Sequence, residues 1–193
     1  MSCDGLPDAF FKARLAGTID ADLHWQAADM QCDGMRRPDG QGLRVTFTGA
    51  VAGERLTLLF GAPRLAEGAS GRAVPVNVTL IRQGGRLYGT RGEGKCVLDE
   101  VAQALIGGQV APAAHPSDPD RAAQALHAEE ASPPVPRRWR IDARGFCLEP
   151  ARAVAAGSGA GDAILLTTFD FRGQLAWEPD PPAAPAVIDL AVP

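Results

Sequence analysis

Four cysteines are the residues of this chain with the most distinctive chemistry: Cys3, Cys32, Cys96 and Cys147. An even number of widely separated cysteines is typical of two disulfides, which form in oxidising compartments rather than in the reducing cytosol. Cys3 and Cys32 are each followed by Asp-Gly, a turn dipeptide, whereas Cys147 continues the inward-facing series of a predicted strand. Position alone favours Cys3 with Cys32 and Cys96 with Cys147, although all three connectivities are open.

The cysteines also have other possible uses. Structural zinc sites usually draw ligands in pairs two to four residues apart, and this chain has no such pair, so no metal site is predicted. A cysteine as near the start as Cys3 also permits a bacterial lipoprotein, in which Cys3 carries a lipid anchor and one other cysteine stays unpaired. A further alternative is an intracellular structural protein with four reduced thiols.

Residues 89–96 fit the G-x-x-x-x-G-K spacing of a nucleotide-binding loop, with Cys96 where that loop needs Ser or Thr. A thiol is a poor ligand for the hard magnesium ion. Residues 98–106 suit the short helix that the motif requires, but the strand before the loop belongs to a predicted hairpin, not to a parallel sheet. We therefore interpret the segment as a Gly-rich turn leading to a structural cysteine, and we predict no cofactor.

Candidates for catalysis are few. Asp20 and Asp22 are spaced to share one face of a strand, the geometry that a carboxylate-dependent hydrolase uses, and His24 lies close by. A solvated strand face and a surface histidine explain them more simply, and no serine lies in a G-x-S-x-G elbow. We predict no catalytic residue. The hydrolase alternative requires two carboxylates that converge in a concave pocket with separated pKa values.

The segment from Cys32 to Gly42 is the best candidate for a recognition loop. It places Met35, Arg36, Arg37 and Asp39 between glycines, although a plain connection between strands explains the segment more simply.

Alternation of apolar and polar residues predicts the fold. The alternating segments centre on 11–19, 43–48, 76–80, 139–147 and 165–177, with a more uniformly apolar strand at 56–60. Gly84 and Gly85 suit a two-residue hairpin turn. Gly17, Gly49 and Gly173, each within an apolar-x-Gly-x-apolar pattern, are placed on the inward face. The fold class is therefore all-β: an antiparallel β-sandwich or flattened barrel of about seven to nine strands, with one or two short helices.

Proline divides the chain, since six of its 16 prolines lie in 107–137 and five in 178–193. We predict a single β domain over 1–193, with a Pro/Ala-rich, partly mobile insertion at about 107–137 and a Pro-rich C-terminal tail at about 178–193. Within the insertion, 121–128 is a helix candidate.

Composition excludes several functions. At 193 residues and a net charge of −4, with scattered basic residues, the chain lacks the electrostatic pattern of a nucleic-acid binder. No apolar run reaches the length of a transmembrane segment, and no export signal is visible. The disulfide hypothesis nevertheless predicts a periplasmic or extracellular location. The predicted function is a non-enzymatic binding, inhibitory or accessory module whose ligand is an unknown protein or glycan.

Overall fold

The computed structural model describes residues 3, 5–90, 94–108, 136–154 and 161–177. These residues form eleven strands and, within those ranges, no helix: β1 (Phe10–Gly17), β2 (Ala21–Gln26), β3 (Met30–Arg36), β4 (Leu43–Val51), β5 (Glu54–Ala62), β6 (Gly71–Arg82), β7 (Leu87–Gly89), β8 (Cys96–Gly107), β9 (Arg137–Cys147), β10 (Ala151–Ala153) and β11 (Ala163–Trp177).

The all-β antiparallel class is confirmed, but the predicted number of strands is too low. One of the additional strands, β10, is only three residues long and leaves little periodicity to detect. The helix candidate at 98–106 is wrong, because this segment lies in β8, which pairs with β6 on one side and β9 on the other. The candidate at 121–128, most of the insertion and the whole Pro-rich tail lie outside the described residues.

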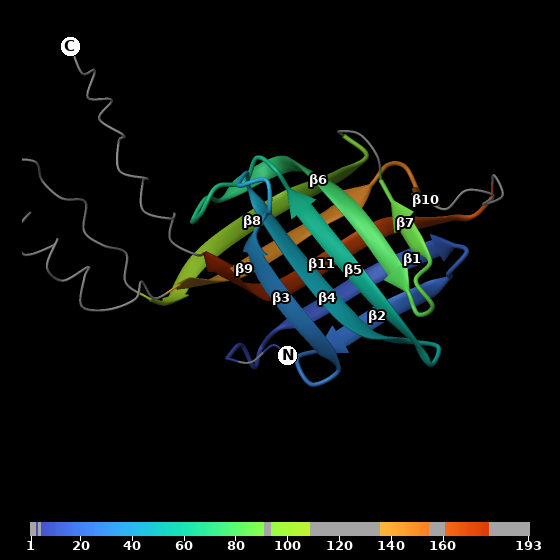
Figure 1. The fold of residues 1–193 in the computed structure, drawn as a ribbon, viewed down its shortest axis with the longest axis horizontal. Helices are drawn as coiled ribbons and strands as arrows, with labels where there is room; N and C mark the ends of the chain where they lie inside the picture. Colours follow the sequence, from blue (N-terminus) through green and yellow to red (C-terminus); the bar gives the residue numbers. More distant parts are fainter. Residues whose placement is uncertain (1–2, 4, 91–93, 109–135, 155–160, 178–193) are drawn as a thin grey trace, which may run out of the picture.

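The strands belong to one sheet, part of which curls into a ring. Its hydrogen-bonded order is β10-β7-β6-β5-β4-β3-β11-β1-β2, with β8 and β9 linking β6 to β11 and with β10 also paired to β11. All ladders are antiparallel except one parallel bridge between Met35 of β3 and Ala176 of β11. Figure 1 shows β3, β4 and β5 crossing in front of β11 and β1, so the arrangement is a flattened barrel.

Aromatic rings fill the space between the two crossing layers. Phe11 from β1 lies 4.9 Å from Phe47 of β4, and Phe47 lies 4.9 Å from Phe171 of β11, measured between ring centroids. Phe60 of β5 contacts both Phe169 and Phe171. Because alternate residues of a strand point to opposite faces, each of these strands presents its apolar series to this shared core.

The inward series of β11 changes phase at a β-bulge, which the sequence does not predict. Ile164 and Leu166 are buried before the bulge, and Phe169 and Phe171 after it, whereas Leu165 is only partly buried. The register against β1 shifts between Arg14 and Leu15, where β11 contains one extra residue. Continuous alternation over 165–177 predicts that Leu165 faces inward with Phe169 and Phe171. This prediction is wrong, because an inserted residue moves all preceding side chains to the opposite face.

The hairpin between β6 and β7 forms as predicted, with a longer loop. Leu80 pairs with Tyr88 and Ile81 with Leu87. The Arg82 amide donates to the carbonyl of Arg86, so the closing pair encloses three residues, not the predicted two. Gly84 and Gly85 have φ angles of 89° and 83°, which only glycine adopts without strain.

The inward glycines allow close packing inside the barrel. A Cβ at Gly49 would lie 2.5 Å from ring atoms of Trp25, and a Cβ at Gly173 would lie 3.1 Å from the Phe47 ring. Gly17 is exposed instead, at the end of β1, so its expected inward position is wrong. At Gly49 and Gly173, aromatic rings of the protein itself thus occupy the space that a side chain would need.

Replacing Gly49 tests this packing. Gly49→Ala should lower the free energy of unfolding by about 1–3 kcal/mol, because the new methyl group displaces the Trp25 ring. That ring is held by a 3.0 Å hydrogen bond from Trp25 Nε1 to the carbonyl of Ala50, which leaves it little freedom to move. Gly61→Ala is the control, since its Cβ would meet nothing nearer than a backbone oxygen at 4.0 Å. Equal losses in urea unfolding of the two variants would contradict the explanation.

The turn between β4 and β5 contains a non-glycine residue in the left-handed region, Ala52, with φ of 49°. It is followed by Gly53 and enclosed by the pair Val51–Glu54, so this is a two-residue hairpin. Ala52→Asn should raise the free energy of unfolding by about 0.5–1 kcal/mol, because Asn-Gly suits a turn with two positive φ angles. Chemical denaturation should show no comparable gain for Ala28→Asn, at the neighbouring β2–β3 turn.

Candidate functional site

The cysteines form the two disulfides that their positions predict, Cys3–Cys32 and Cys96–Cys147. All four are buried, with at most 7% of any residue exposed. Cys96 and Cys147 lie directly opposite each other in the β8–β9 ladder. The described cysteines include no free thiol, and two disulfides indicate an oxidising environment.

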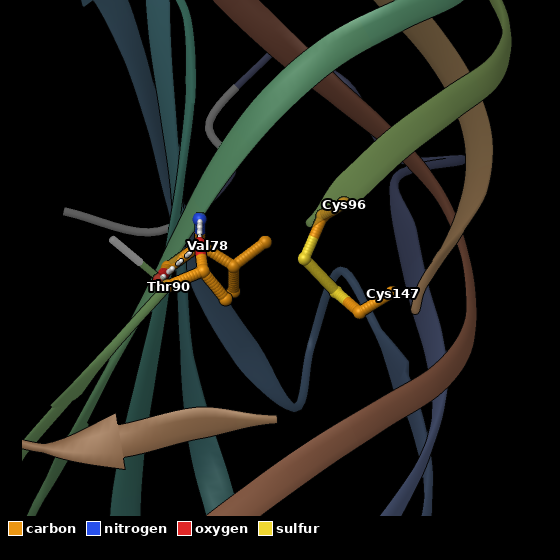
Figure 2. Close-up of a disulfide and its surroundings, with 4 residues drawn as sticks. All are labelled: Val78, Thr90, Cys96 and Cys147. Carbon is orange, nitrogen blue, oxygen red and sulfur yellow. Dashed lines mark hydrogen bonds between the residues drawn. A yellow bond between two sulfur atoms is a disulfide. The ribbon is translucent and has the colours of Figure 1, made fainter. Parts of the chain in front are cut away.

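The Cys96–Cys147 bond lies where the barrel wall divides. The edge of β6 that faces away from β5 pairs with two strands in turn. It pairs with β8 as far as Val76 and with β7 from Thr79 onward. Between these ladders, the hydroxyl of Thr90 accepts from the Val78 amide at 2.9 Å, and the Thr90 amide donates to the Val78 carbonyl at 3.0 Å. Figure 2 shows this pair of residues beside the disulfide. We call this point, where the β6–β8 and β6–β7 ladders separate, the fork. The two bonds between Val78 and Thr90 keep the backbone groups of Val78 paired there.

The Cys3–Cys32 bond attaches the N-terminal segment to β3. Leu6 and Ala9 are buried beyond this bond, and the carboxylate of Asp8 pairs with Arg172 of β11 at 2.7 Å. The segment therefore contacts the region where β3 and β11 share only a single bridge. This bond helps to close the barrel.

The residues that resembled a nucleotide-binding loop lie in an antiparallel setting. Gly89 ends β7, residues 91–93 lie outside the described residues, and Lys95 Nζ pairs with the Glu149 carboxylate at 3.0 Å. Cys96 is occupied by its disulfide. The position that would need a hydroxyl for magnesium thus holds a structural cysteine.

The carboxylates considered for hydrolysis share one arginine on an exposed surface. Arg14 contacts Asp20 at 2.6 Å and Asp22 at 3.4 Å, and both aspartates are about 65% exposed. His24 is exposed on β2. These groups form a solvated ion-pair network, not the concave pair that a hydrolase requires.

The predicted recognition loop, Cys32 to Gly42, is wrong in its first half, which lies in β3, and residues 37–42 form a closed connection between β3 and β4. The Arg37 amide donates to the Gly42 carbonyl at 3.2 Å, and the Asp39 carboxylate accepts from the Gln41 amide at 3.1 Å and from the Arg37 guanidinium at 2.5 Å. Arg36 Nε donates to the Gly40 carbonyl. The loop is therefore organised by its own hydrogen bonds.

The four residues that the sequence suggested for recognition do not share one surface. Met35 lies on the outer face of the sheet, where its sulfur accepts from Arg44 at 2.9 Å. Arg36 lines a hollow of about 260 Å³, together with Gly40, Gly42, Ala66, Glu67, Arg137 and Trp177. Arg37 and Asp39 form the loop itself.

Residues distant in the sequence complete this hollow. Glu67 accepts from Arg137 Nε at 2.5 Å and from Trp139 Nε1 at 2.9 Å. Trp177 Nε1 donates to the amide oxygen of Gln103. This cluster is not predictable from the sequence, because Glu67 and Arg137 are 70 positions apart and no local spacing indicates that they meet.

A second hollow of about 500 Å³ lies at the opposite end of β3 and β4. It is lined by the β2–β3 and β4–β5 turns and by Gln31, Thr48, Arg55 and Gln83. Beside it, the Arg82 guanidinium contacts Glu54 at 2.6 Å. This hydrogen bond raises the pKa of Arg82, as the hydrogen bond to Asp142 raises the pKa of Arg172, so both guanidinium groups stay charged.

Over the described ranges, no group of three or more metal-ligating side chains forms a cluster. The same residues contain no helix long and apolar enough to cross a membrane. Comparison with protein-family models, with curated proteins and with solved structures found no match. Fold and covalent structure define the class: an all-β protein whose partly ringed antiparallel sheet is held by two disulfides.

Proposed function

We propose that this protein is an exported module, periplasmic or surface-associated, that binds a protein or glycan ligand without catalysing a reaction. The observation that supports export is the pair of buried disulfides, each joining elements that are distant in the sequence. Such bonds persist in oxidising compartments. The proposed contact region is the β3–β4 loop, which is already ordered by its own hydrogen bonds and therefore loses little conformational freedom on binding.

Thiol counting tests the covalent part of the proposal. Protein isolated from its native compartment and denatured without reductant should show no reactive thiols, and all four should appear after reduction. Four reactive thiols before reduction would contradict export and support the intracellular alternative.

The lipid-anchor hypothesis for Cys3 predicts a different result. A lipid thioether uses the same sulfur that joins Cys32 in the structure, so a lipidated chain has one unpaired cysteine. Mass spectrometry of the N-terminal peptide distinguishes the two hypotheses. A peptide in which Cys3 is linked to Cys32 supports the disulfide, and a lipid adduct on Cys3 supports the anchor.

Photo-crosslinking in intact cells tests the binding region. A photo-reactive amino acid at Gln41, which is exposed in the β3–β4 loop, should give a discrete adduct with the ligand. The matched control is the same substitution at Ala28, an exposed turn residue at the other end of β3. Adducts at Ala28 but not at Gln41 would place binding elsewhere.

A further inference from the structure

The hollow beside the β3–β4 loop is built from four separate parts of the chain, and we call it the mouth hollow. Arg36 comes from the end of β3, Glu67 from the β5–β6 connection, Arg137 from the start of β9 and Trp177 from the end of β11. At about 260 Å³ it is smaller than the roughly 300–1,000 Å³ that encloses a whole small-molecule ligand. It therefore suits one group of a larger ligand.

The charged side chains of the mouth hollow are ordered by bonds within the protein. The Glu67 carboxylate accepts from Arg137 Nη2 at 2.7 Å and from Trp139 Nε1 at 2.9 Å. Arg36 Nε donates to the Gly40 carbonyl at 2.9 Å. A guanidinium carries its N–H donors in one rigid plane, so a ligand meets groups whose orientation is already set.

The β5–β6 connection beside the mouth hollow is held by the buried amide of Gln103. This amide donates to the carbonyls of Ala66 and Ala69 at 2.8 and 2.9 Å, and its oxygen accepts from the Trp177 indole at 3.3 Å. These bonds attach the connection to β8 and β11. Binding a ligand therefore costs little free energy for ordering this part of the protein.

The residues that line the mouth hollow carry a net positive charge, in a chain whose net charge is −4. The guanidinium groups of Arg36 and Arg137 outnumber the single carboxylate of Glu67. The planar fork of an arginine matches the geometry of a carboxylate. One excess positive charge also matches a carboxylate better than a phosphate, which carries about −1.5 to −2 at neutral pH. The lining therefore favours a ligand group with one carboxylate.

The Glu67 carboxylate narrows the class of ligand further. It repels a second acidic side chain, which disfavours a run of acidic residues in a peptide. It accepts hydrogen bonds from hydroxyl groups, and a uronic acid carries hydroxyls on the same ring as its carboxylate. Trp177 adds an aromatic surface against which the apolar face of a sugar ring packs.

We propose that the mouth hollow binds a uronic acid residue of an acidic glycan. The carboxylate of the sugar pairs with Arg36 and Arg137, and its hydroxyls donate to Glu67. The proposal rests on the binding function proposed above, because Gly40 and Gly42 of the β3–β4 loop line the same hollow. It adds the chemical class of the ligand.

Isothermal titration calorimetry on the full, disulfide-bonded chain tests the proposal, with trigalacturonate as the probe. Binding with a dissociation constant of about 0.01–1 mM is expected. The methyl ester of trigalacturonate keeps the sugar rings and lacks the charge, so it should bind at least about tenfold more weakly. A short polyglutamate peptide and inorganic phosphate should also bind at least about tenfold more weakly.

Arg36→Gln should weaken trigalacturonate binding at least about tenfold. The matched control is Arg152→Gln, which removes the same charge at an exposed position on β10 and should leave the affinity unchanged within about twofold. Thermal unfolding confirms that each variant is folded. If Arg36→Gln does not fold, Gly40→Asp serves in its place, since aspartate tolerates the φ of 74° there. Its Cβ would lie 4.0 Å from the Arg36 guanidinium, so the new carboxylate competes with that of the sugar.

Several results would overturn the proposal. They are the absence of trigalacturonate binding at about 10 mM, equal binding of the methyl ester, tighter binding of polyglutamate or phosphate, and equal weakening by Arg36→Gln and Arg152→Gln. The photo-crosslinking experiment separates this failure from failure of the proposed function. A cellular adduct at Gln41 without trigalacturonate binding overturns the ligand class and leaves the binding region in place.

Discussion

Removing the Cys96–Cys147 bond should lower the free energy of unfolding by about 4 kcal/mol. The cysteines are separated by 51 positions, and closing a loop of that length restricts the unfolded chain by about this amount. The double variant Cys96→Ala/Cys147→Ala is the appropriate change, because a single substitution leaves a reactive thiol. Both residues are buried at the fork of the barrel wall, so the loss of their sulfur contacts adds to the effect.

Urea unfolding at equilibrium measures this difference. Cys3→Ala/Cys32→Ala is the comparison. Its cysteines are 29 positions apart, so the loss of this bond should lower the free energy of unfolding by about 3.5 kcal/mol. A loss below about 1 kcal/mol for the Cys96–Cys147 pair would show that the fork holds β8 and β9 together without its covalent bond.

The second large effect concerns the aromatic core. Phe11→Ala should lower the free energy of unfolding by about 3–5 kcal/mol, because it removes a fully buried ring and leaves a cavity. The centroid of Phe11 lies within 5.8 Å of those of Trp25, Phe47 and Phe60, which come from three other strands. Few neighbours can move into the space without disturbing several ladders at once.

The preceding residue provides a matched control. Phe10 points to the outer face of β1, where its ring contacts Lys12 and Arg172 at 5.3 and 5.9 Å from the centroid. Phe10→Ala should cost less than about 1 kcal/mol, since exposed cation-π contacts contribute little. Similar losses for the two variants, measured by denaturant unfolding, would contradict the assignment of the two faces of β1.

Several features of this fold were predictable because they depend on local chemistry. Strand side chains alternate with period two, so the inward positions of Val45, Phe47, Val78 and Leu80 follow from the sequence alone. Turn dipeptides and strand register favoured the cysteine pairing that the structure has, but they left the other two connectivities open.

Other features depend on contacts that local patterns do not record. The bulge in β11 shifts the register by one residue, which no period-two pattern anticipates, and it reverses the side on which Leu165 lies. The strand β8 has apolar residues spaced compatibly with a helix, and only its pairing with both β6 and β9 fixes the extended form.

The same distinction applies to the candidate sites. The chain by itself indicated most strand faces, the glycines of the β6–β7 turn and the favoured pairing of the cysteines, because each follows from backbone geometry or cysteine chemistry within a few residues. Tertiary structure alone decided that Arg36 shares a hollow with Glu67 and Arg137, and that the indole of Trp177 donates to Gln103. These properties arise from the order in which distant strands pair, and strand order is set by the packing of the whole barrel rather than by any segment of it.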